Sequence, residues 1–130
     1  MTGVSVIDLE VENQEQFISN IAFTCEQLSP APKVVVFNYP HNPSSVTVEP
    51  EFWVDVVKLA RKYGFMVVSD FAYADVAFDG YTPPRFLAAP GATEVGGEST
   101  PIRQVYNMTG WRCGLCAGNP YFVTARGTIK

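Results

Sequence analysis

Apolar residues along the chain fall into short runs separated by stretches with helical spacing, which predicts alternating strands and helices. The predicted strands span residues 4–11, 34–39 and 65–70, and the predicted helices between them span residues 14–28 and 50–63. This β-α-β-α-β order is typical of a parallel sheet with right-handed crossovers. The second and third strands are almost continuously apolar, which favours burial on both of their faces.

The ends of the predicted helices carry residues that commonly start or stop helices. Asn13 can cap the first helix, with Gln16 three residues later at the capping-box position. Pro50 suits the first position of the second helix, and Gly64 suits its end. These signals support the boundaries that the apolar spacing predicts.

The second half of the chain has a weaker pattern. Residues 78–97 are rich in Gly, Pro and Ala, which predicts a largely irregular segment. Two late strands are predicted at residues 102–106 and 111–117, and the turn at residues 107–110 is too short for a parallel crossover, so these strands should be antiparallel. Residues 122–129 have the pattern of a further helix.

We therefore expect a single domain over the whole chain, with an α/β fold of three layers. Its sheet should be mostly parallel, with about five strands and an antiparallel last strand. The helices should cover the sheet, and ten apolar residues should form the main core. These are Phe17, Ile21, Val34, Val36, Phe37, Phe52, Val56, Leu59, Val67 and Val68.

Composition narrows the range of functions. The 130 residues are 47% apolar and 17% charged, below the roughly 25% charged residues of ordinary soluble domains. The net charge of −4 argues against partners such as nucleic acids or membrane surfaces, which attract clustered Lys and Arg. No apolar run approaches membrane-spanning length, and three cysteines do not suit a disulfide framework, so we expect a cytoplasmic protein.

Cys113 and Cys116 have the C-x-x-C spacing of redox and zinc sites. In the predicted strand, residues three apart point to opposite faces. His41 is the only histidine, whereas a structural zinc ion needs four ligands. We interpret both cysteines as core residues and expect no metal site.

Three short segments carry a family resemblance. They are residues 38–43 (Asn-Tyr-Pro-His-Asn-Pro), 69–73 (Ser-Asp-Phe-Ala-Tyr) and 106–112 (Tyr-Asn-Met-Thr-Gly-Trp-Arg). In order and spacing they resemble the large domain of class I/II, fold-type I, aminotransferases, in the branch of alanine and LL-diaminopimelate aminotransferases. The resemblance covers the central part of that domain and implies pyridoxal phosphate as the cofactor.

The resemblance also implies roles for four residues. Asp70 matches the aspartate that pairs with the pyridine nitrogen, which lets the ring act as an electron sink. Asn42 and Tyr73 match the residues that hydrogen-bond the phenolate oxygen of the ring, and Arg112 matches the arginine that binds the phosphate. Each residue alone is an ordinary turn, cap or surface residue. Together, they are expected at one edge of the sheet, beyond the carboxyl ends of its strands.

Gln104 departs from the family pattern. Two residues before the tyrosine of the Tyr-Asn-Met segment, the family carries the lysine that forms a Schiff base with the cofactor, and this chain carries glutamine. A glutamine amide is not nucleophilic and cannot relay the protons of the reaction. Pro101 likewise replaces a phosphate-binding serine. None of the remaining lysines is a credible substitute, and these are Lys33, Lys58, Lys62 and Lys130.

The resemblance further implies that a family strand between residues 4–11 and 34–39 is missing. Direct pairing of those two segments would satisfy their backbone groups, so we expect it. Surface that missing domains would have covered is expected to allow self-association.

These observations favour a non-catalytic α/β scaffold derived from an aminotransferase cofactor domain, as an excised, engineered or degenerate fragment. Two alternatives stay open. One is a pyridoxal-phosphate-dependent aminotransferase of amino acids and 2-oxo acids, with its missing parts on another chain or with Gln104 as a trapping substitution. The other is a weak, non-covalent binder of pyridoxal phosphate or another aromatic phosphate, through the four residues named above.

Overall fold

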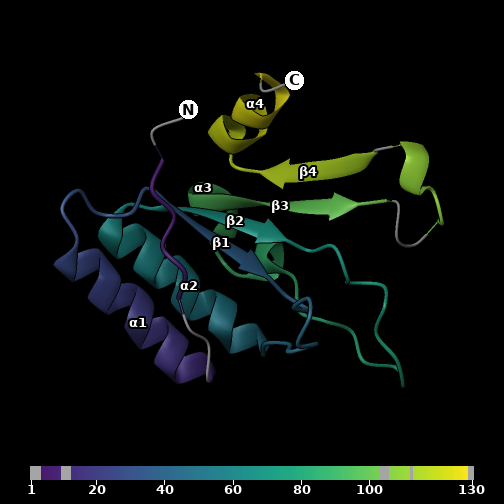
Figure 1. Cartoon of the computed structure of the whole chain (residues 1–130), viewed down its shortest axis with the longest axis horizontal. Coiled ribbons are helices and arrows are strands. Elements are labelled where there is room, and N and C mark those ends of the chain that lie inside the picture. The colour runs from purple at the N-terminus through teal and green to yellow at the C-terminus, as the bar shows by residue number, and fades with distance from the viewer. Residues whose placement is uncertain (1–3, 10–12, 103–105, 112, 129–130) are drawn as a thin grey trace. The chain divides into compact units, whose positions relative to one another are not determined.

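The computed structural model describes residues 4–9, 13–102, 106–111 and 113–128. The chain divides into two compact units, Met1–Pro32 and Lys33–Lys130, and each is described by itself. Figure 1 shows the elements of both units in chain order.

The first unit contains helix α1 (Gln14–Gln27). Asn13 caps this helix as predicted, because its side chain accepts a hydrogen bond of 2.8 Å from the backbone N–H of Gln16. Residues 4–9 form no strand, and the side chains of Val4, Val6 and Ile7 are exposed, so the predicted strand at 4–11 and its pairing with 34–39 are wrong over residues 4–9, while residues 10–11 lie outside the described residues. A strand needs a neighbouring strand for its backbone and a covered face for its apolar side chains, and residues 4–9 gain neither.

The second unit holds the sheet. In chain order, its elements are β1 (Val34–Asn38), α2 (Pro50–Tyr63), β2 (Met66–Asp70), η1 (Phe86–Ala88), α3 (Ala92–Val95), β3 (Gly96–Pro101), η2 (Thr109–Trp111), β4 (Gly114–Gly118) and α4 (Pro120–Thr128). The strand order is β1-β2-β3-β4, with β1, β2 and β3 parallel and β4 antiparallel to β3. The predicted α/β class, mostly parallel sheet and antiparallel last strand are confirmed, with four strands in place of five.

Helix α2 covers one face of the sheet with an aromatic cluster. Phe37 of β1 makes edge-on contacts with Phe52 and Trp53 of α2, at ring-centroid distances of 5.8 Å and 5.5 Å. The indole N–H of Trp53 donates to the carbonyl of Pro84 at 3.0 Å, so its polar atom is satisfied inside the core. Phe86 of η1 closes the cluster against Trp53.

The predicted core is partly correct. Phe17, Ile21, Phe37, Phe52, Val56 and Val67 are buried, whereas Leu59 and Val68 are half-buried. Val34 and Val36 are 51% and 64% exposed, so their assignment to the core is wrong. They lie on the face of β1 that α2 does not cover, and the reading of this strand as buried on both faces fails for that reason.

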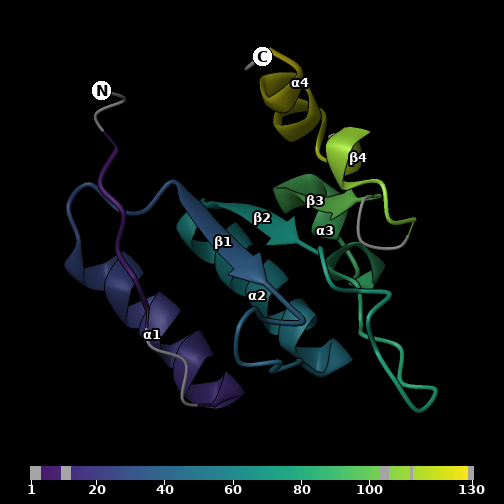
Figure 2. The ribbon, with the colours of Figure 1, turned by 45° about the vertical axis from the view of Figure 1, so that its right-hand side comes forward.

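Helix α4 lies on the opposite side of the sheet from α2, which both views show (Figure 1 and Figure 2). Its Phe122 is buried over β3, where a Cβ atom at Gly97 would overlap the Phe122 ring. The second unit therefore has a helix on each side of its sheet, with the β1 part of the second face left open.

Strand β3 was misplaced by the sequence pattern, which predicted it at 102–106. Ile102 and Tyr106 lie in turns, and the strand is the Gly-Gly-Glu-Ser-Thr-Pro segment before them. A Cβ atom at Gly96 would overlap the carbonyl oxygen of Val67, so only glycine lets β2 and β3 approach as they do. Tertiary packing here overrides the low strand propensity of glycine.

Candidate functional site

The candidate site begins where β1 and β2 end. Asn38 and Asp70 are the last residues of the two parallel strands and face each other in the register. Both are half-buried. Ligands of open α/β sheets bind beyond such carboxyl ends, so the loops that follow these strands form the candidate site.

The loop after β1 is a tight turn that presents Asn42. The backbone N–H of His41 donates to the carbonyl of Val46 at 2.9 Å, and the N–H of Ser45 donates to the carbonyl of His41 at 2.8 Å. The His41 ring also hydrogen-bonds the Ser44 hydroxyl at 2.7 Å. These bonds close the loop upon itself and leave the Asn42 side chain exposed.

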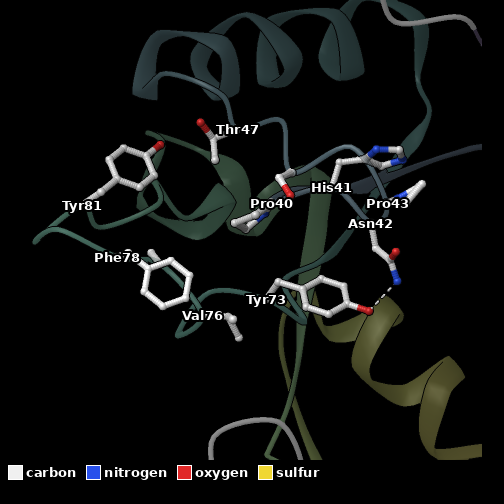
Figure 3. A pocket seen from close by; sticks show the side chains of 11 residues that line it. Pro40, His41, Asn42, Pro43, Thr47, Tyr73, Val76, Phe78 and Tyr81 are labelled. Atoms are coloured by element: carbon white, nitrogen blue, oxygen red, sulfur yellow. Dashed lines mark hydrogen bonds between the residues drawn. The ribbon is translucent and has the colours of Figure 1, made fainter.

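The side chains of Asn42 and Tyr73 meet between the two loops. The Asn42 carboxamide donates a hydrogen bond of 2.7 Å to the Tyr73 hydroxyl, as Figure 3 shows. The pair therefore places one amide donor and one phenol donor beside each other at the carboxyl edge of the sheet. This juxtaposition agrees with the shared role that the family resemblance implies for them.

A cavity of about 370 Å³ lies beside this pair (Figure 3). Its wall is mainly proline, aromatic and small polar side chains, and includes both Asn42 and Tyr73. The other lining residues are Pro40, His41, Pro43, Ser45, Thr47, Val76, Ala77, Phe78 and Tyr81. Asp70 is not part of this wall, so the structure gathers at the cavity two of the three predicted site residues that it describes.

Asn38 connects the two halves of the site and was not predicted. Its side-chain oxygen accepts a hydrogen bond of 3.1 Å from the backbone N–H of Asn42. Its side-chain nitrogen donates at 3.1 Å to the backbone carbonyl of Asp70. An asparagine at the end of an apolar strand, just before a Tyr-Pro turn, is the sequence signal that points to such a link.

Tyr39 attaches the start of this loop to the hydrophobic core. Its ring is buried and packs edge-on against Phe52 and Trp53, at centroid distances of 5.6 Å and 6.2 Å. Burial raises the pKa of the Tyr39 hydroxyl above its usual value. The residue between Asn38 and the turn is thus a neutral, fixed part of the core, which limits the freedom of the loop.

A partly buried ion pair involves the next strand of the sheet, β3. Glu98 of β3 is 4% exposed and pairs with Ser69 in the β2 register. The Arg85 guanidinium donates to one Glu98 carboxylate oxygen at 3.0 Å and stacks over the Phe71 ring. Among the residues that the structure describes, the other Glu98 oxygen and the Ser69 hydroxyl are buried and have no hydrogen-bond partner. Glu98 lies in a Gly-rich segment without an apolar strand pattern, so its burial could not be predicted from the sequence.

Two predicted site positions fall outside the described residues. These are Gln104, at the expected lysine position, and Arg112, the expected phosphate ligand. Pro101, at the expected serine position, ends β3 opposite Gly114. Of the four predicted site residues, the structure therefore describes Asn42, Asp70 and Tyr73, and the roles of all four toward a cofactor stay predictions.

The cysteine interpretation is wrong for one residue. Cys113 is exposed and precedes β4, while Cys116 lies in β4 and is half-buried. In the described parts of the chain, no group of three or more His, Cys, Asp or Glu side chains is placed to hold a metal ion. Among the same residues, no helix is both long and apolar enough to span a bilayer.

The arrangement suits a flat ring that carries an oxygen substituent. The Asn42 carboxamide and Tyr73 hydroxyl are both hydrogen-bond donors, and 2.7 Å apart they can share one acceptor oxygen. Asp70 supplies a carboxylate at the end of the neighbouring strand. Of the side chains that the structure describes around this edge, none is an amine able to bond covalently to an aldehyde.

Comparisons with known proteins identify the family of this chain. The family profile for aminotransferase class I and II matches residues 1–128. An LL-diaminopimelate aminotransferase of Desulforudis audaxviator is 45% identical over 114 residues, which covers 88% of this chain and 29% of that protein. The glutamate-pyruvate aminotransferase AlaC of Escherichia coli is 35% identical over 130 residues, 100% of this chain and 32% of that protein.

A solved structure shows the same fold. The aminotransferase of Neisseria meningitidis matches with a TM-score of 0.73 at 27% identity, over 84% of this chain and 29% of that chain. In each of these comparisons the chain spans about a third of the length of the relative.

Proposed function

The chain belongs to the class I and II aminotransferase family, and we propose that it is a non-catalytic form of part of the family's cofactor-binding domain. The family depends on pyridoxal phosphate, which supplies an electron sink when bound. In this chain, the position at which the resemblance implies the cofactor-binding lysine holds Gln104. That substitution is the observation that carries the proposal.

The chemical reason is the loss of the amine. Covalent catalysis by this cofactor needs a primary amine that can lose its proton and attack an aldehyde. The Gln104 amide is a neutral hydrogen-bonding group without that reactivity. Pro101 also supplies no hydroxyl for a phosphate group. The chain keeps the fold and part of the ring environment without the group that forms the bond.

A transamination assay tests this proposal. Purified chain is incubated with pyridoxal phosphate, an amino acid and a 2-oxo acid, and the formation of the new amino acid is measured. We expect no amino-group transfer above the rate with free cofactor. Saturable transamination that persists through further purification would contradict the proposal and restore the aminotransferase alternative.

A second candidate function is non-covalent binding of pyridoxal phosphate. The hydrogen bond between Asn42 and Tyr73 supports it, because these two donors lie together beside a cavity. In this proposal Asn42 and Tyr73 bind the ring oxygen, Asp70 faces the ring nitrogen and Arg112 binds the phosphate. The chain would then still bind the cofactor ring, although it does not catalyse the reaction.

Titration of the chain with pyridoxal phosphate tests the second candidate, with the absorbance of the cofactor as the readout. We expect a saturable spectral shift that Tyr73→Phe and Asn42→Ala weaken. The matched control is Tyr81→Phe, since Tyr81 lines the same cavity without a hydrogen bond to Asn42. A linear absorbance change that does not saturate would exclude specific binding and favour a scaffold that binds no cofactor.

A further inference from the structure

We propose that Asn38 is a positioning residue, which fixes Asn42 against Tyr73 and ties this pair to the end of β2. The positioning role is inferred from hydrogen bonds within this chain. The expected effect on ligand binding rests in addition on the second candidate function. Asn38 does not itself line the cavity, and its two side-chain hydrogen bonds go to the backbone of Asn42 and Asp70, so it acts through the loop.

The two hydrogen bonds of the Asn38 side chain join it to two different segments, the loop after β1 and the end of β2. The oxygen holds the Asn42 backbone N–H at 3.1 Å, four residues along the chain. The nitrogen holds the Asp70 carbonyl at 3.1 Å, on the adjacent strand. One planar carboxamide therefore fixes the start of the first loop relative to the end of the second strand.

This link matters because the Asn42 side chain is exposed and its partner lies on the other loop. An exposed asparagine has several accessible rotamers, and a hydrogen bond to Tyr73 holds only if the backbone below Asn42 is fixed. Asn38 supplies that restraint from within the sheet, since it is half-buried and follows the buried Phe37. The pair is thereby positioned before any ligand arrives.

The opposite end of the sheet offers a matched comparison. The side chain of Asn119, between β4 and α4, also donates to a backbone carbonyl, that of Glu94 at 2.7 Å. It also accepts from a backbone N–H, that of Tyr121 at 2.9 Å. Asn119 thus has the same bonding pattern at a place without site residues, and Asn119→Ala controls for the general loss of two such bonds.

The experiment compares the full chain with its Asn38→Ala, Asn38→Asp and Asn119→Ala variants. The Asn42 side-chain amide and Tyr73 ring signals are followed by NMR, and pyridoxal phosphate affinity is measured by absorbance. Asn38→Ala should shift both sets of signals and weaken binding by about tenfold, because the loop would then have to be ordered when the ligand binds. Asn38→Asp keeps the acceptor for the Asn42 N–H but sets a carboxylate oxygen against the Asp70 carbonyl in place of the donor, so it should also shift both sets of signals.

Asn119→Ala should leave the Asn42 and Tyr73 signals and the affinity unchanged. Unshifted signals in a folded Asn38→Ala variant would overturn the proposal. If that variant does not fold, Asn38→Asp decides, because unchanged signals there would show that the link to Asp70 positions nothing. If the parent chain binds no pyridoxal phosphate, the binding function fails, while the NMR signals still test the role of Asn38.

Discussion

The carboxyl ends of β1 and β2 and the connection from β3 to β4 contribute differently to the candidate site. At the first, Asn38, Asn42 and Tyr73 form a connected set of hydrogen bonds above an aromatic core. At the second, Pro101 and Gln104 stand where the resemblance implies a serine and a lysine. In our proposal, the first region keeps groups that would recognise a ring, and the second lacks the groups that would react with it.

The difference separates two tasks that one active site normally combines. Recognition needs donors and carboxylates at fixed positions, which strand ends and short loops of a packed sheet supply. Covalent chemistry needs one amine with the right reactivity, and a single substitution removes it. A chain can therefore keep most of its fold and part of its binding geometry after its reaction is gone.

The largest expected effect comes from breaking the core below the first region. Val67 of β2 is 0% exposed, and Val67→Asp would bury an unpaired charge in the centre of the sheet. We expect a loss of at least ~3 kcal/mol in the free energy of unfolding, enough to remove the cooperative transition of a marginally stable chain. Thermal unfolding followed by circular dichroism measures it.

Leu115→Asp is the control in the second region, because Leu115 lies in β4 and is 65% exposed. The new carboxylate stays in water, so the midpoint of unfolding should change little. Equal destabilisation by both substitutions would show that the two regions do not differ as described.

A smaller effect is expected where β3 begins beside β2. A methyl group at Gly96 of β3 would overlap the carbonyl of Val67, so Gly96→Ala should push β3 away from β2. We expect destabilisation of about 1–3 kcal/mol, the usual range for overpacking, measured by denaturant unfolding.

Gly114→Ala is the matched glycine substitution. Gly114 faces Pro101 across the antiparallel pair, and the nearest atom to its added Cβ lies at 3.5 Å, an ordinary contact. Its unfolding midpoint should stay close to that of the parent. A Gly96→Ala variant as stable as Gly114→Ala would mean that the close approach of β2 and β3 is not required.

The smallest effect concerns alkaline pH. Burial raises the pKa of Tyr39 above 10.0, so the folded state holds this proton more tightly than the unfolded state. The stability linked to Tyr39 is therefore present below pH 10 and is lost as the pH rises through the folded pKa. Tyr39→Phe should flatten this alkaline decline, as seen in denaturant unfolding from pH 9 upward. Tyr121→Phe, at an exposed position of α4, is the control, and an equal flattening there would contradict the assignment to Tyr39.

Sequence patterns predicted the first region well because its signals are local. Helix α2 carries Pro50 at its start and Gly64 in the left-handed conformation at its end, and both boundaries match the prediction. Phe37 and Val67 lie in strands that apolar runs identify, and Asn42 and Tyr73 lie in short motifs. The exposure of Val34 and Val36 did not follow from these runs, because it depends on which face α2 covers.

The second region was predicted poorly because its determinants are distant in sequence. Strand β3 begins with Gly96 and Gly97. Glycine is needed at these positions because Val67 and Phe122, from other elements, approach the strand closely. The burial of Glu98 likewise depends on Arg85, thirteen residues away in the irregular segment. Such contacts leave no periodic pattern in the strand itself, whereas the antiparallel pairing with β4 followed from the short connection.

The central proposal is that this chain lacks the amine that would bond covalently to pyridoxal phosphate, because residue 104 is glutamine, and reductive trapping tests it most directly. The parent chain and its Gln104→Lys variant are incubated with pyridoxal phosphate and borohydride, and the mass of each protein is measured. We predict no added mass at residue 104 of the parent and one cofactor-sized addition at that residue in the variant. A reducible, stoichiometric addition to the parent chain, mapped by peptide digestion to one of its lysines, would contradict the account.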